Sequence, residues 1–190
     1  MKVVEIFRSI QGEGPSQGYP SIFLRLAGCN LDCIWCDTRY AREGGTDMSC
    51  NEITSMISAY PGKRICITGG EPLLQHDQLL PLLARLHDMG YQVEIETNGT
   101  IDFRQFQPFA SICMDVKCPS SGERSDLSLL RQISGNDSIK FVVADRDDCR
   151  YAEEVLDSHP VRGEVFFSPV YGSEYGTIAE FLLERNLPAR

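Results

Sequence analysis

Short apolar runs alternate with amphipathic segments along almost the whole chain, and this alternation limits the possible folds more than any other feature of the sequence. The apolar runs have the length of buried strands, whereas the segments between them place apolar residues at the three- and four-residue spacing of a helix. An alternating order of this kind predicts parallel strands joined by crossover helices. The expected strands are residues 1–8, 21–27, 64–68, 93–97, 110–116, 138–143 and 164–167.

Four segments between these strands are predicted to be helices. Ser49 and Glu52 have the spacing of a capping box, so a helix is expected to start there and to end at residues 61–62 (Pro-Gly). Asp77 is expected to cap a second helix, which ends at residues 89–90 (Met-Gly). The remaining helices are expected at residues 147–156 and 177–184, and residues 103–109 are expected to form a weak helix or a loop.

About six parallel strands predict an α/β fold in which the sheet curves into an incomplete (β/α) barrel. A closed eight-stranded barrel usually needs about 250 residues, and this chain has 190. That length suits one domain, so residues 1–190 are expected to form a single domain. In parallel α/β folds ligands bind at the carboxyl ends of the strands, and functional residues are therefore expected there.

Three cysteines directly follow the strand expected at residues 21–27. Cys29, Cys33 and Cys36 have the spacing C-x3-C-x2-C. Thiolates normally hold each of the four irons of a 4Fe–4S cluster, so three cysteines would leave one iron open to another ligand. A zinc site or a group of buried cysteines is the alternative, although zinc sites usually have a second C-x2-C pair downstream, which this chain lacks.

Five other cysteines are scattered through the sequence. No signal-peptide pattern is present at the N-terminus, so disulfides are not expected. Cys66 and Cys113 lie in apolar runs and are predicted to be reduced core residues. Cys50 is the only plausible fourth cluster ligand, and a cluster closed by Cys50 would only carry electrons.

The excess of acidic over basic residues limits which ligands the chain is expected to bind. Lys and Arg number 18 against 27 Asp and Glu, which gives a net charge of −9. This charge argues against general nucleic-acid binding, because phosphate backbones attract basic proteins. A small-molecule substrate is therefore expected. No apolar run approaches the roughly 20 residues of a membrane-spanning helix, so we expect a cytoplasmic protein without membrane contact.

Further motifs lie at the ends of three other expected strands. Residues 69–72 (Gly-Gly-Glu-Pro) can bring bare backbone close to a charged amine or carboxylate, and a simple strand-to-loop turn is the alternative. Residues 96–99 (Glu-Thr-Asn-Gly) include a common turn pair. Residues 115–117 (Asp-Val-Lys) place a lysine that would either meet a carboxylate or remain solvated. With the cysteines, these motifs are predicted to face one pocket.

The segment before the cysteines provides a candidate substrate site. Residues 10–15 (Ile-Gln-Gly-Glu-Gly-Pro) would be a plain turn on their own. Arg25, however, lies within an apolar strand, and charged groups are buried only when they are paired. Arg25 is therefore predicted to form a bidentate pair with a substrate carboxylate.

The combination of these motifs resembles a known enzyme family. The cysteine spacing and residues 69–72 resemble the cluster and glycine motifs of the radical S-adenosylmethionine (SAM) superfamily. With the later strand-end motifs, the resemblance extends over most of the chain. The narrower resemblance, to the 7-carboxy-7-deazaguanine synthase family, lies in residues 7–14, 18, 23–25, 28–30 and 35–38.

The resemblance implies a lyase with a radical mechanism. The family converts 6-carboxy-5,6,7,8-tetrahydropterin to 7-carboxy-7-deazaguanine with loss of ammonia, a step towards queuosine and other deazapurines. By the resemblance, a radical derived from SAM abstracts a hydrogen at C6 of the pterin, the ring contracts, and SAM is regenerated. The implied cofactors are a 4Fe–4S cluster, SAM and Mg²⁺. The implied partners are an electron donor protein such as flavodoxin and a second copy in a homodimer.

The resemblance also implies roles for individual residues, none of them an acid or base catalyst. Cys29, Cys33 and Cys36 would hold the cluster, and Thr38 would bind a Mg²⁺ that bridges to the substrate carboxylate, unless it only caps a helix. The substrate would be bound by Ile10, Gln11, Gly12, Glu13, Arg25 and Thr68. SAM would be bound by Trp35, Cys36, Asp37, Gly70, Asn98, Asp115, Val116 and Lys117.

Two other functions fit parts of the sequence. A glycyl-radical activating enzyme uses the same cysteine spacing on a protein substrate, but it has no need of residues 11–14 with Arg25. A non-catalytic iron–sulfur electron carrier would need Cys50 as a fourth ligand. Members of the 7-carboxy-7-deazaguanine synthase family usually continue into a segment with a Gln-x-His-Lys-like element after the position of Arg190. Substrate contacts from that segment are therefore not assigned.

Overall fold

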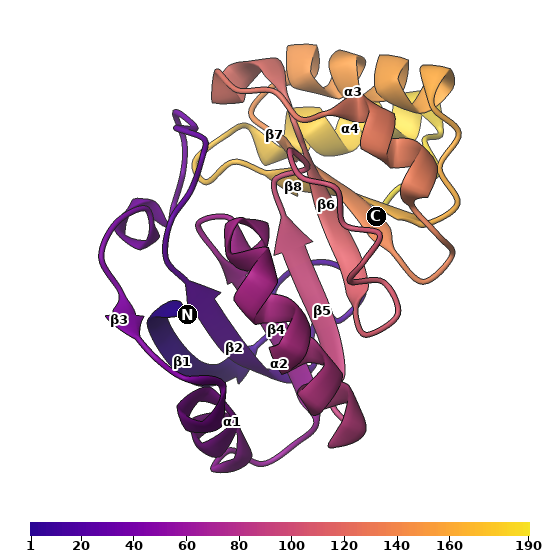
Figure 1. The fold of residues 1–190 in the computed structure, drawn as a ribbon. Helices are drawn as coiled ribbons and strands as arrows, with labels where there is room; N and C mark the ends of the chain where they lie inside the picture. The colour runs from indigo at the N-terminus through magenta and orange to yellow at the C-terminus, as the bar shows by residue number, and fades with distance from the viewer.

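The structure, a computed structural model, describes all 190 residues and contains one eight-stranded sheet with four α-helices (Figure 1). The strands are β1 (Lys2–Ile10), β2 (Pro20–Leu26), β3 (Thr46–Asp47), β4 (Arg64–Gly69), β5 (Gln92–Thr97), β6 (Ser111–Lys117), β7 (Ser138–Val143) and β8 (Glu164–Pro169). The helices are α1 (Cys50–Ser58), α2 (His76–Asp88), α3 (Arg146–Ser158) and α4 (Tyr175–Arg185). None of these helices has the length and apolar character needed to cross a membrane.

The strand order is β3-β1-β2-β4-β5-β6-β7-β8. The six strands from β2 through β8 are parallel, whereas β1 pairs antiparallel with both β2 and β3. The predicted α/β fold with about six parallel strands is confirmed, and β3 and β8 form the two free edges of an incomplete barrel. The strand β3 carries no signal in the sequence, because two residues are too few for a periodic pattern. Residues 104–109, within the segment expected to be a weak helix or a loop, form turns.

Each parallel strand divides its side chains between two faces of the sheet. Successive side chains alternate, and those of one face pack with the helices in a single core cluster. On β4 and β5, this cluster includes Ile65, Ile67, Val93 and Ile95. In Figure 1, α2 covers β4 and β5, while α3 and α4 lie together near β7 and β8. The core therefore lies between the sheet and the helices, and the other face is available to polar residues.

The loop between β1 and β2 folds over this other face. Its two ends are joined by a hydrogen bond from Gln11 N to Tyr19 O (2.9 Å). Farther along the loop, Ser16 Oγ donates to Glu94 Oε2 on β5 (3.1 Å). A Cβ on Gly14, whose φ is +65°, would lie 3.0 Å from Oε1 of Glu94. Glycine is therefore favoured where the loop meets β5.

The starts of the first two helices test the capping predictions. The capping box is confirmed: Ser49 Oγ accepts from Glu52 N (3.3 Å), and the Glu52 carboxylate accepts from Ser49 N (2.8 Å). The prediction that Asp77 caps α2 is wrong. A 3₁₀ turn (Pro72–Gln75) runs directly into α2, so Gln75 occupies the N-cap and Asp77 lies inside the first turn.

Replacing Ser49 with alanine should lower the free energy of unfolding by about 1 kcal/mol, because a backbone donor at the start of α1 loses its acceptor. Ser55 is a matched control, since it is exposed within the same helix, and Ser55→Ala should leave stability unchanged or slightly raised. Urea denaturation of both variants measures the difference. Equal effects of the two substitutions would contradict the capping role.

Candidate functional site at the carboxyl ends of the strands

The cysteine loop follows the carboxyl end of β2, as predicted. Cys29, Cys33 and Cys36 are free thiols in the loop that joins β2 to β3. A hydrogen bond from Cys36 N to Cys33 O (3.2 Å) holds two of them in one turn. Burial raises the pKa of the Cys33 thiol, whereas the charge of Lys117 lowers it. The positive charge of Lys117 therefore lies near Cys33, which would have to be a thiolate in order to bind a cluster iron.

The donor set of this loop fits an iron–sulfur cluster. No three His, Cys, Asp or Glu side chains are placed to share a single metal ion. A cluster instead binds each thiolate through a different iron, and three cysteines in one loop suit that requirement. Cys50 packs against the core at the start of α1, and α1 lies at the opposite end of the sheet from the cysteine loop (Figure 1). The structure therefore gives no support to Cys50 as a fourth ligand.

The glycine motif after β4 lies directly against the cysteine loop. A Cβ on Gly70 would fall 2.0 Å from Gly28 O, and a Cβ on Gly69 would fall 2.1 Å from Leu26 O. Gly70 N donates to Leu26 O (3.0 Å), and Glu71 N donates to Gly28 O (2.7 Å). Only glycine permits so close an approach of two backbones, so this motif is more than a strand-to-loop turn.

Glu71 ties the glycine motif to the end of β5. Its fully buried carboxylate accepts hydrogen bonds from Leu73 N (2.9 Å), Thr97 Oγ1 (2.9 Å) and Asn98 N (2.6 Å). Burial raises the pKa of Glu71 to about 7, against the lowering effect of these three hydrogen bonds. The ends of β4 and β5 are therefore held in a fixed relation next to the cysteine loop.

Asn98 extends this contact from β5 to the cysteine loop. Its Nδ2 donates to Asn30 Oδ1 (2.9 Å) and lies 3.9 Å from Sγ of Cys29. Its Oδ1 accepts from Thr100 N (3.1 Å), so the side-chain amide is fixed on both sides. Asn98 therefore faces a predicted cluster ligand, in addition to its place in a turn.

Trp35 and Lys117 lie together on the side of the cysteine loop nearest β6. Trp35 Nε1 donates to Ser120 Oγ (2.9 Å), which in turn donates to Asp148 Oδ2 (2.5 Å). Nζ of Lys117 lies 5.7 Å from the centre of the Trp35 ring and 2.9 Å from Oδ2 of Asp115. Lys117 is buried, so the alternative of a solvated lysine is wrong.

Three predicted residues stand apart from these side-chain contacts. Val116 is buried in the core on the helix side, so only its peptide groups can reach a cofactor. Ile10 is 65% exposed at the end of β1. Gly12 is exposed, with open space where a Cβ would be.

Thr38 lies next to the cysteine loop but does not act as a helix cap. It occupies the N-cap position of a 3₁₀ turn (Arg39–Ala41) without a capping hydrogen bond from its side chain. Its Oγ1 instead donates to Asp37 Oδ1 (2.7 Å). The capping alternative is therefore contradicted, and two oxygen-bearing side chains lie beside Cys36.

Arg25 already has one carboxylate partner within the protein. Its Nε donates to Glu5 Oε1 (2.8 Å), and the same oxygen accepts from the Tyr40 hydroxyl (2.9 Å). The guanidinium carbon lies 5.8 Å from the centre of the Phe7 ring and 5.7 Å from that of Tyr40. These contacts fix the guanidinium through Nε, while neither Nη atom has a hydrogen-bond partner. The two Nη atoms are thus left for an incoming carboxylate.

Glu96 joins several predicted substrate residues on the polar face of the sheet. Its carboxylate accepts from Gln11 Nε2 (3.1 Å), Thr68 Oγ1 (2.9 Å) and Cys66 Sγ (3.4 Å). Cys66 and Cys113 are buried, as predicted, but they lie outside the helix-side core. Glu96 therefore connects the β1–β2 loop to β4.

Sequence reasoning did not select Glu94 or Lys140 as site residues, and it included Glu96 only as part of the strand-end motif at residues 96–99. Their signal is alternation, because a charged residue stands at every second position of residues 93–97 (Val-Glu-Ile-Glu-Thr), and Lys140 interrupts the apolar β7. A charge in a buried strand needs a partner or a ligand. The pattern could therefore have identified the polar face.

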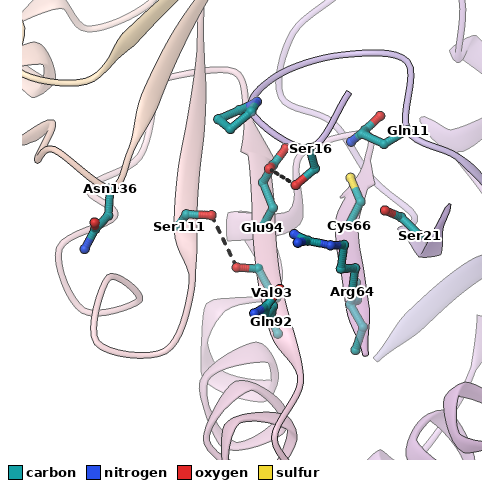
Figure 2. Close-up of a pocket in the computed structure, with 12 residues that line it drawn as sticks. Gln11, Ser16, Ser21, Arg64, Cys66, Gln92, Val93, Glu94, Ser111 and Asn136 are labelled. Atoms are coloured by element: carbon teal, nitrogen blue, oxygen red, sulfur yellow. Dashed lines mark hydrogen bonds between the residues drawn. The ribbon is translucent and has the colours of Figure 1, made fainter. Parts of the chain in front are cut away.

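A cavity lies at the other end of the strands. Its volume is about 590 Å³, and Arg64, Gln92 and Ser111, the first residues of β4, β5 and β6, line it. Figure 2 shows these residues with Glu94, whose carboxylate reaches Ser16. Gln11 is the only predicted site residue in the lining. This cavity therefore does not coincide with the predicted site. The contacts between the strand ends identify that site instead.

The sequence is similar to curated proteins along its whole length. A model of the radical SAM superfamily matches residues 24–116. The chain is 53% identical over 190 residues to the 7-carboxy-7-deazaguanine synthase of Methanospirillum hungatei, covering 100% of this chain and 81% of that protein. It is 42% identical over 177 residues to the 7-carboxy-7-deazaguanine synthase of Koribacter versatilis, covering 90% and 78%.

The fold is also similar to solved structures. The crystal structure of QueE from Escherichia coli matches with a TM-score of 0.82 at 26% identity and covers 99% of this chain and 92% of that chain. Streptococcus suis SuiB bound to its precursor peptide matches with a TM-score of 0.62 at 12% identity, covering 86% and 46%. The second likeness shows the fold alone.

The carboxyl group of Glu94 should make stability depend on pH. Glu94 is 6% exposed, and its Oε1 has no hydrogen-bond partner. Burial, together with the charge of Glu96, raises the pKa of Glu94 from 4.5 to about 7. Between these two values the folded protein holds a proton that the unfolded chain releases. The free energy of unfolding therefore falls as pH rises through this window.

Glu94→Gln should remove this contribution, about 3 kcal/mol between pH 4.5 and 7. The variant should gain stability relative to the native sequence as pH rises, and the difference should be constant above the window. Glu43→Gln, at an exposed residue without an ion pair, is the control. Urea denaturation at several pH values measures both variants, and parallel pH profiles for Glu94→Gln and the native sequence would contradict the raised pKa.

Proposed function

Because the chain belongs to the 7-carboxy-7-deazaguanine synthase family of the radical SAM superfamily, we propose that the residues gathered at the carboxyl ends of its strands carry out that synthesis. The chain is an enzyme that converts 6-carboxy-5,6,7,8-tetrahydropterin to 7-carboxy-7-deazaguanine with loss of ammonia, a step towards queuosine. The observation that carries the residue assignment is the close contact of Gly70 and Asn98 with the cysteine loop.

The cofactor site is assigned to the cysteine loop and the strand ends around it. Three thiolates would hold a 4Fe–4S cluster, and when bound, the cluster and SAM supply the radical that removes a hydrogen atom from the substrate. Lys117 offers a buried positive charge for the SAM carboxylate, and Trp35 is fixed beside it by Ser120. The proposed cluster ligands are Cys29, Cys33 and Cys36. The other proposed SAM contacts are Asp37, Gly70, Asn98, Asp115 and the peptide groups of Val116.

The substrate site is assigned to the polar face next to these strand ends. The two free Nη atoms of Arg25 have the geometry for a bidentate contact with the pterin carboxylate. Gln11, Thr68 and Glu96 form one hydrogen-bonded group that can donate to and accept from the polar edge of the ring. Glu13 adds a second carboxylate. Ile10 and Gly12 are assigned backbone contacts only.

A magnesium ion is assigned to Thr38. Mg²⁺ prefers oxygen ligands and keeps several waters. The Thr38 hydroxyl and the Asp37 carboxylate lie 2.7 Å apart beside the cysteine loop, which supports an oxygen site at this position. The ion would supply positive charge for the substrate carboxylate, in addition to that of Arg25.

The partners and setting are proposals as well. Residues 1–190 are proposed to act as one radical SAM domain, since all eight strands join a single sheet. The electron donor is proposed to be a protein such as flavodoxin, and Ile34, 67% exposed in the cysteine loop, offers it an apolar contact. A cytoplasmic location and a homodimer are proposed from the family resemblance.

Anaerobic incubation of the cluster-loaded enzyme with 6-carboxytetrahydropterin, SAM, Mg²⁺ and a reductant should yield the deazaguanine, identified by mass. Cys33→Ala should lose the 4Fe–4S absorbance and all turnover, because one iron loses its thiolate. Cys50→Ala should keep both, since Cys50 packs on the core. Loss of the cluster in Cys50→Ala would support the electron-carrier alternative, and absence of product from the native sequence would contradict the synthase assignment.

Removal of Mg²⁺ should lower the rate of product formation, because the substrate carboxylate loses a counter-charge. Thr38→Val removes the hydroxyl at nearly constant volume and should abolish the stimulation by added Mg²⁺. Thr38→Ser keeps the hydroxyl and should retain the stimulation. Rates measured across a range of Mg²⁺ concentrations test the assignment. Turnover that is unchanged without the metal would overturn the role of Thr38.

A further inference from the structure

Four side chains of alternating charge form an ion-pair chain across the polar face of the sheet. Glu13 of the β1–β2 loop is paired with Lys140 of β7. Nζ of Lys140 also lies 3.1 Å from Oδ1 of Asp115 on β6, and Nζ of Lys117 lies 2.9 Å from Oδ2 of Asp115. The ion-pair chain therefore runs from the loop assigned to the substrate to the strand end assigned to SAM.

Lys140 is the member of this ion-pair chain that is assigned to neither ligand. It is 4% exposed, and none of the residues assigned to the substrate or to SAM lies on β7. Burial would lower the pKa of Lys140, but Asp115, Glu96 and Glu13 raise it well above its usual value. Lys140 therefore keeps its proton and its positive charge, and it lies between two carboxylates.

The two contacts of Lys140 are unequal. Its ammonium donates a hydrogen bond to Glu13. Oδ1 of Asp115, in contrast, is buried without a hydrogen-bond partner, although the ammonium lies 3.1 Å away. The contact with Asp115 is ionic but poorly aligned. A small shift of the ammonium can thus exchange one hydrogen bond for the other.

From this geometry we propose that Lys140 is a positioning residue that couples the substrate site to the SAM site. A substrate donor that binds Glu13 competes with Lys140 for that carboxylate. Lys140 then completes its hydrogen bond to Asp115, which weakens the hold of Asp115 on Lys117. A less tightly held Lys117 is more available to the carboxylate of SAM. Substrate therefore tightens SAM binding, and by linkage SAM tightens substrate binding.

This coupling rests on the proposed function, and it assigns a role in ligand binding to the ion-pair chain. A site that binds SAM tightly only when substrate is present limits radical formation to complexes that contain a target. The sign of the coupling follows from the order of charges, because each displaced ion pair strengthens the next contact along the chain. No movement of a strand is required, since only side-chain atoms shift.

The test is calorimetric titration of the cluster-loaded enzyme with SAM, anaerobically and without reductant, in the presence and absence of 6-carboxytetrahydropterin. For the native sequence, substrate should lower the Kd of SAM at least about 5-fold, the lower end of typical couplings. Lys140→Met should bring this ratio close to one while each ligand still binds. Glu13→Gln should make SAM bind without substrate nearly as tightly as it binds the native enzyme with substrate, because the neutral amide holds the ammonium less strongly than the carboxylate does.

Arg185→Met is the matched control, because it removes a cation from an ion pair with Glu153 that joins α4 to α3 on the helix side. It should keep the native ratio. An unchanged ratio in Lys140→Met, or a ratio near one in the native sequence, overturns the coupling. Failure of the native sequence to bind SAM or the pterin contradicts the proposed function instead. If Lys140→Met does not fold, Glu13→Gln decides, since Glu13 is only half-buried.

Discussion

The site depends on one close contact between two neighbouring strand ends. The peptide groups of Gly69 and Gly70 lie against those of Leu26 and Gly28, where no side chain fits. Because β2 and β4 are parallel neighbours, this contact fixes where the cysteine loop leaves the sheet. The buried carboxylate of Glu71 then holds β5 to the same edge. Without this packing, the cysteines would have no fixed position relative to the proposed cofactor contacts.

The two faces of the sheet divide stability and chemistry between them. The helix-side face is apolar and contributes to a core of 38 buried residues, large enough to carry the hydrophobic stabilisation. The other face buries charged groups, which is costly unless each has a partner. Lys140, Asp115 and Lys117 meet this condition by pairing with one another and with Glu13. Glu94 has a hydrogen-bond partner for Oε2 only, and burial of its carboxylate raises its pKa.

The sequence predicted the fold well, because strand and helix periodicity is local and the six parallel strands carry strong apolar runs. It predicted the strand-end motifs for the same reason. It did not predict the pairing of Glu13 with Lys140, which joins residues 127 positions apart. Nor did it predict the partner of Arg25, because an irregularity in β1 shifts the register that places Glu5 opposite Arg25. Both contacts depend on register between distant segments, which composition and spacing do not specify.

The distribution of charge on the polar face suits the two ligands that are proposed to bind there. Arg25 at one side and Lys117 at the other stand where the carboxylates of the pterin and of SAM are assigned. The carboxylate of Glu96 on β5 lies between them in the strand order, where the ring of the proposed pterin substrate would donate hydrogen bonds. A pocket with its cations exchanged for carboxylates would repel the acid groups of both ligands. On the proposed assignment, the polar face selects ligands by the position of charge, and Lys140 is the cation in the ion-pair chain that is assigned to neither ligand.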